Sequence, residues 1–140
     1  MDRQQYSALA SRASDLVDAG DRPAAIELLE QLVHSDLPDF DRAMMCMNIA
    51  TVQDQMGDTG KAMQTYASAV DLERKTESYF IAENRAAYCA KLGLYDESSR
   101  FYDDLLRHPH LKPEDRDRLL QNISALGKLR SSLEVGVPCC

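Results

Sequence analysis

The segment GDTGKAMQTY, residues 57–66, decides the fold of this 140-residue chain because related segments stand on both sides of it. In each copy a glycine is followed five residues later by a small residue, and four residues after that by a large apolar or aromatic one. The flanking copies are GDRPAAIELL, residues 20–29, and GLYDESSRFY, residues 93–102. The glycines lie 37 and 36 residues apart, and a period of this length indicates stacked structural repeats.

Apolar residues at steps of three and four surround each glycine segment, and β-branched and aromatic runs are scarce, so the sequence predicts an all-helical chain. Gly20, Gly57 and Gly93 are each expected to end the first helix of a pair in the left-handed conformation. Asp39 or Asp41 is expected to cap the third helix. About seven helices are predicted, over residues 2–19, 21–33, 40–56, 59–75, 78–92, 95–107 and about 114–130.

The formal charge of −7 argues against nucleic acid as a partner, because binding to phosphates depends on Lys and Arg. No stretch approaches the ~20 apolar residues of a membrane span, and the first residues lack the pattern of a signal peptide. We therefore expect a cytoplasmic protein that binds neither nucleic acid nor membrane.

Residue types that support catalysis do not converge in the sequence. Cys46 and Cys89 are expected to be reduced core residues, whereas Cys139 and Cys140 are read as surface thiols of a flexible tail. His108 and His110 flank a proline, without a third metal ligand at suitable spacing; solvated loop residues are the plainer reading. The sequence thus predicts no enzyme, no metal and no cofactor.

The repeat resembles the tetratricopeptide repeat, a helix-turn-helix unit with small and large apolar residues at fixed intervals. The resemblance covers most of the chain. In the middle unit it is carried by Cys46, Ile49, Ala50, Gly57, Ala62, Tyr66 and Ala69. In the first unit the matching residues are Leu9, Ala13, Leu16, Gly20, Ala25, Leu29 and Leu32, and in the third, more loosely, Ala82, Ala86, Cys89, Gly93, Ser98, Tyr102 and Leu105.

This resemblance implies an alpha-alpha superhelix of stacked helix-turn-helix hairpins. The helical domain would span residues 1–134, with repeats at about 6–37, 43–76 and 79–110, a capping helix at about 114–130, and a flexible tail at 135–140. The spacing exceeds the ~34 residues usual for the family, and the proline that commonly ends a unit is displaced or missing.

The family also implies a concave groove, lined by the first helix of each hairpin, that holds a peptide or a partner helix. Asn48 and Asn84 occupy the same place in successive units, where family members often bind a peptide with asparagine. The plainer alternative is that both satisfy neighbouring groups of the protein itself. The mapped partner-binding residues are Ser14, Met44, Met47, Asn48, Thr51, Gln55, Phe80, Glu83, Asn84 and Ala87.

We therefore predict a non-enzymatic adaptor with a protein or peptide partner. Of the residues that form the family's clamp for chaperone tails, this chain keeps only Asn48, so that ligand is not expected. Two alternatives stay open: a structural module that forms a homodimer through residues such as Leu129 and Leu133, and a regulatory subunit of a separate enzyme.

Overall fold

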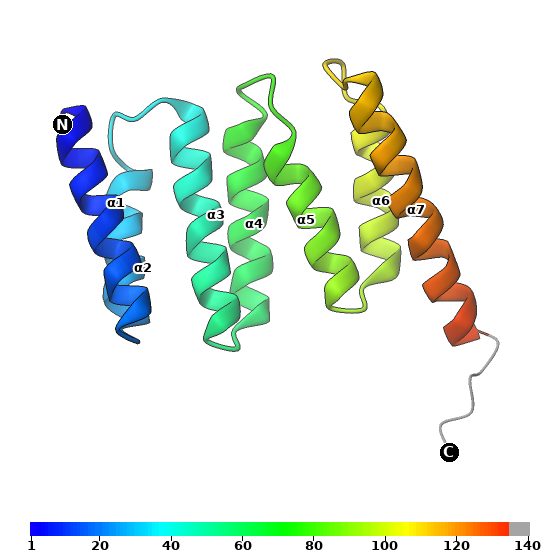
Figure 1. The fold of residues 1–140 in the computed structure, drawn as a ribbon, viewed down its shortest axis with the longest axis horizontal. Helices are drawn as coiled ribbons and strands as arrows, with labels where there is room; N and C mark the ends of the chain where they lie inside the picture. Colours follow the sequence, from blue (N-terminus) through cyan, green and yellow to red (C-terminus); the bar gives the residue numbers. More distant parts are fainter. Residues whose placement is uncertain (135–140) are drawn as a thin grey trace. The chain divides into compact units, whose positions relative to one another are not determined.

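The computed structural model describes residues 1–134, which form seven α-helices and no strand (Figure 1). The expected all-α class and number of helices are confirmed. The predicted tail, with Cys139 and Cys140, lies outside the described residues. The helices are α1 (Arg3–Asp18), α2 (Arg22–Val33), α3 (Asp39–Gln55), α4 (Thr59–Glu73), α5 (Phe80–Lys91), α6 (Tyr95–Leu106) and α7 (Pro113–Glu134).

The chain divides into two compact units, and the boundary falls in the first turn of α5. The first unit is Met1–Ile81, and the second begins at Ala82. In the first unit, α1 packs on α2, α2 on α3 and α3 on α4 (Figure 1). In the second unit α7 packs against α6.

The repeated glycines end the first helix of each pair, as the sequence predicts. Gly20, Gly57 and Gly93 have φ angles of +84°, +80° and +79°, and no other described residue has a positive φ. Just after the first of these glycines, the Asp21 amide donates to the Leu16 carbonyl at 2.8 Å, which closes the last turn of α1. The corresponding amides after Gly57 and Gly93 make the same bond at 3.0 and 2.9 Å.

Aspartates cap α2 and α4, but the predicted cap of α3 is wrong. The carboxylate of Asp58 accepts from the Lys61 amide at 3.1 Å, as expected for an N-cap. Pro38 instead holds the N-cap position of α3, without a side-chain hydrogen bond. Its extended backbone already leads the chain into the helix, so Asp39 and Asp41 fall inside the first turn, where the helix dipole favours acids.

Small residues fill the positions where the helices of the first unit approach one another. Ala25, Ala43, Ala50, Ala62 and Ala69 are fully buried. Large side chains occupy the space around them; Leu29, Leu32, Ile49, Val52, Tyr66 and Val70 are all buried. Small residues facing large ones produce the interdigitated packing of a helical stack.

A buried carboxylate lies at the end of α4, in the last part of the first unit. Glu73, in the last position of α4, is 1% exposed, and its Oε2 accepts from the Ile81 amide at 2.6 Å and from the Ser78 hydroxyl at 3.1 Å. Ile81 is the second residue of α5, where backbone amides lack partners within the helix. Glu73 therefore caps α5 from the preceding helix.

In the second unit a serine replaces the small alanine of the repeat. Ser98 is fully buried, and its hydroxyl donates to the Ala86 carbonyl at 2.8 Å, joining α6 to α5. The Arg85 guanidinium lies 3.8 Å from the ring centre of Phe101, close enough for a cation–π interaction.

Candidate functional site: a groove between α1 and α3

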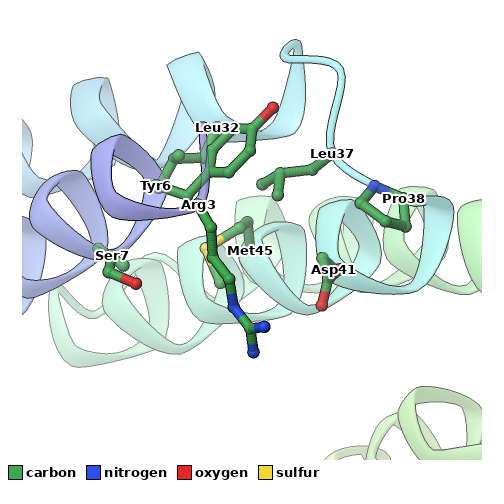
Figure 2. A pocket seen from close by; sticks show the side chains of 9 residues that line it. Arg3, Tyr6, Ser7, Leu32, Leu37, Pro38, Asp41 and Met45 are labelled. Carbon is green, nitrogen blue, oxygen red and sulfur yellow. The ribbon is translucent and has the colours of Figure 1, made fainter. Parts of the chain in front are cut away.

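Two neighbouring hollows lie between α1 and α3 in the first unit, and together they form what we name the α1–α3 groove. The smaller, the amide pocket, encloses about 250 Å³ and is lined by Ala10, Ala13, Ser14, Val17, Leu29, Met45, Asn48, Thr51, Val52 and Gln55. The larger, the linker pocket, encloses about 450 Å³ and is lined by Arg3, Tyr6, Ser7, Ala10, Leu32, Leu37, Pro38, Asp41 and Met45 (Figure 2).

Helical periodicity explains why these residues face the same groove. On α1 the lining residues recur at steps of three and four from Arg3 to Val17, and on α3 they do so from Asp41 to Gln55. Such steps place side chains on one face of a helix. The two pockets share Ala10 and Met45, so they are continuous in the middle of the groove.

Four predicted partner-binding residues lie around the amide pocket: Ser14, Asn48, Thr51 and Gln55. All four are exposed. The Thr51 hydroxyl donates to the Met47 carbonyl at 3.2 Å, and Gln55 Oε1 accepts from Arg22 Nε at 3.4 Å. The Asn48 side chain makes no hydrogen bond within residues 1–134.

The other predicted residues line neither pocket. Met44 and Met47 are half-buried on α3. Phe80, half exposed, begins α5, followed in the second unit by Asn84, half-buried and engaged in an interaction within the chain, and by the exposed Ala87.

Glu83, also predicted to bind a partner, forms an ion pair with α7. Its two carboxylate oxygens lie 2.6 and 2.9 Å from nitrogens of Arg118, and Asp115 lies 2.8 Å from the same guanidinium. The hydrogen bond to Glu83 is the main reason that the pKa of Arg118 is raised. This carboxylate is therefore already neutralised inside the second unit.

The linker pocket escaped the sequence analysis because one of its walls belongs to the connection between α2 and α3. The Tyr6 hydroxyl donates to the Asp36 carboxylate, which ties α1 to this connection beside Leu37 and Pro38. That hydrogen bond is the largest cause of the raised pKa of Tyr6 and of the lowered pKa of Asp36. The sequence did contain a signal for this pocket. The face of α1 that lines the groove continues by one helical turn from Ser7 towards the N-terminus, to Arg3.

Charge is distributed unequally between the two units. Residues 1–81 contain 7 Lys and Arg against 14 Asp and Glu, a formal charge of −7. Residues 82–140 contain 9 of each kind and are formally neutral. The whole negative charge of the chain therefore belongs to the unit that holds the groove.

Residues associated with metal or thiol chemistry are not grouped in the described part of the chain. No three His, Cys, Asp or Glu side chains within residues 1–134 are placed to hold a metal ion. Cys46 and Cys89 are buried, as predicted, and neither forms a disulfide in the described chain; burial raises the pKa of both thiols. A raised pKa keeps the thiol protonated and so lowers its reactivity.

No described helix combines the length and the apolar character needed to cross a bilayer.

Paired helices, glycine-ended turns and a groove between successive first helices define a helical-repeat scaffold. A crystal structure of a tetratricopeptide repeat protein from Parabacteroides merdae ATCC 43184 superposes with a TM-score of 0.66 and 25% identity, covering 93% of this chain and 49% of that one. Photosystem I assembly protein Ycf3 of Prochlorococcus marinus (strain MIT 9313) is 31% identical over 91 residues, covering 61% of this chain and 53% of Ycf3.

No protein-family profile matches the chain. It spans about half the length of both proteins it resembles. The fold and the repeat therefore resemble those of tetratricopeptide repeat proteins.

Proposed function

We propose that this protein is a non-catalytic adaptor that holds a peptide or helix of a partner protein in the α1–α3 groove. The observation that carries the proposal is the amide pocket: buried apolar side chains form its floor, and exposed Ser14, Asn48, Thr51 and Gln55 form its rim. An apolar hollow with a few polar groups is the usual form of a binding site. The likeness to a protein named for photosystem I assembly adds support, because assembly requires protein contacts.

Asn48 is the residue through which we expect the groove to bind peptide backbone. Its amide offers donors and an acceptor, and it is exposed without a hydrogen bond in the described chain. Preformed helices lose little conformational entropy on binding, which favours a rigid groove over a flexible loop. For Asn84, at the corresponding place in the next repeat, we propose a separate partner contact within the second unit.

Affinity capture with the full chain, followed by calorimetry on the captured partner, tests this function. Asn48→Ala should weaken binding about two- to tenfold, the loss of one hydrogen bond, while the fold stays intact. Gln31→Ala removes an exposed amide from α2, away from both pockets, and serves as the control. Unchanged affinity in both Asn48→Ala and Asn84→Ala would overturn the proposed site.

Self-association is a second candidate, favoured by the exposed apolar residues of α7. Leu129 and Leu133 are 51% and 66% exposed, whereas Leu126 on the same helix is buried. Pairing of two copies would cover these leucines. Light scattering across a hundredfold range of concentration tests this; a constant monomer mass would exclude it.

A further inference from the structure

The linker pocket is the larger hollow of the groove, and its walls are mainly apolar. Tyr6, Leu32, Leu37 and Met45 surround the space, and their side chains converge in Figure 2. Its volume of about 450 Å³ lies within the range of ~300–1,000 Å³ typical of ligand pockets. A hollow of this size and lining favours a large apolar group.

Two single charges stand on different walls of this pocket. Arg3 belongs to α1 and Asp41 to α3, and both side chains extend away from Tyr6 and Leu32 in Figure 2. Neither forms an ion pair or a hydrogen bond with another residue in the described chain. Each charge is therefore available to a ligand. Arg3 would bind an anionic group of that ligand, and Asp41 a cationic one.

The net charge of the first unit decides whether the pocket favours a cationic or an anionic ligand group. Its formal charge of −7 attracts cations and repels anions, and such a field changes association rates as well as affinity. A cation at Asp41 gains from this field, whereas an anion at Arg3 is opposed by it. Arg3 repels cations from the part of the pocket formed by α1. A basic group of the ligand is therefore expected next to Asp41 on α3.

We propose that the linker pocket receives a large apolar side chain of the partner, and that Asp41 binds a basic residue next to it. The proposal rests on the proposed function, and it names the chemistry of the segment bound: a Phe, Leu or Met flanked by Arg or Lys. The neutral amide pocket then contacts the adjoining backbone. The two hollows share Ala10 and Met45, so one extended segment reaches both.

The test uses NMR of the full chain labelled at methionine methyl groups. Met45 lines both pockets, and its signal among the six methionines is assigned with the Met45→Leu variant. The probes are four acetylated, amidated pentapeptides: Gly-Arg-Phe-Arg-Gly, Gly-Gln-Phe-Gln-Gly, Gly-Glu-Phe-Glu-Gly and Gly-Arg-Ala-Arg-Gly. Each is titrated at low and at physiological salt.

The Arg-flanked phenylalanine peptide should shift the Met45 methyl signal saturably and bind about two- to fivefold more tightly than the Gln peptide, the range of an exposed ion pair. The Glu peptide should bind more weakly than the Gln peptide, and the alanine peptide should give no saturable shift of this methyl. Added salt should reduce the preference for arginine.

Two variants with equal charge change separate a local contact from the general field. Asp41→Asn should reduce the preference for arginine to the part that the general field provides, whereas Glu27→Gln, on α2 outside both pockets, should keep most of it. Equal loss in both variants, or none in either, would refute the role of Asp41. Absence of a Met45 shift with every phenylalanine peptide would refute the pocket, and the Asn48 experiment would still decide the adaptor function separately.

Discussion

Replacing glycine by alanine should have opposite effects at two positions only three residues apart. Gly57 ends α3 with a φ of +80°, whereas Gly60 is the second residue of α4 and has an ordinary helical conformation. A Cβ at Gly57 would meet no atom within 4 Å, and one at Gly60 would lie 3.9 Å from an Asp58 carboxylate oxygen. Clashes are thus absent at both positions, and backbone conformation alone sets the result.

The magnitudes follow from conformational preferences. A left-handed conformation costs an L-residue about 1–2 kcal/mol. Alanine also lowers the conformational entropy of the unfolded chain, which offsets about 0.4–1 kcal/mol of this cost. Gly57→Ala should therefore lower the free energy of unfolding by about 1 kcal/mol. Gly60→Ala should stabilise by about 0.5 kcal/mol, because alanine favours the helix. Gly57→Asn should lose less than Gly57→Ala, since asparagine tolerates the left-handed region.

Urea unfolding followed by circular dichroism measures these differences, and both glycines belong to the first unit, so both variants perturb the same part of the molecule. The slope of the free energy against urea should stay constant among the variants if only stability changes. A neutral or stabilising Gly57→Ala, or an equal loss for Gly57→Asn, would refute the role assigned to the left-handed glycine.

Three further predictions concern polar and titratable groups. Glu73→Ala should lower the free energy of unfolding by about 1–3 kcal/mol and speed hydrogen exchange at the Ile81 amide. Glu73→Gln should lower it less, because its amide oxygen still accepts a hydrogen bond. Equal losses in the two variants would contradict the capping role. Burial raises the pKa of Tyr66 and Tyr102 above 10, so the stability they provide should be complete below pH 10 and decline as pH rises through their folded values; melting scans should show a flatter alkaline decline in Tyr66→Phe. Glu83→Gln should change the free energy of unfolding by less than about 1 kcal/mol, and by less still in 1 M salt, because the pair is solvent-screened; a larger, salt-independent loss would show that it is structurally essential.

The fold could be predicted from the sequence because its determinants are local. Gly57 requires a left-handed conformation, Asp58 caps the helix that follows, and Ala62 allows close packing, all within six residues. These effects depend on spacing along the chain. The cap of α3 was misassigned because Pro38 satisfies the same position through backbone geometry, which a rule based on side-chain acceptors misses.

The site was only partly predictable because its polar and apolar contacts span long stretches of sequence. Asn48 lies on a periodic stripe and was found by its position. Tyr6 of the linker pocket donates a hydrogen bond to Asp36, which lies 30 residues away in the sequence. Outside the groove, Glu83, which the sequence also assigned to partner binding, contacts Arg118, 35 residues away. No local pattern records which distant side chain will meet a given one.

The uneven distribution of charge makes ionic strength a selective influence on one part of the molecule. Like charges within the first unit repel one another in its folded state, and dissolved ions weaken that repulsion. The second unit, with equal numbers of acids and bases, has no net repulsion to relieve. Salt should therefore raise the melting temperature of the groove-bearing unit even while it weakens the attraction of a basic ligand, so that the conditions most favourable for folding and for binding differ.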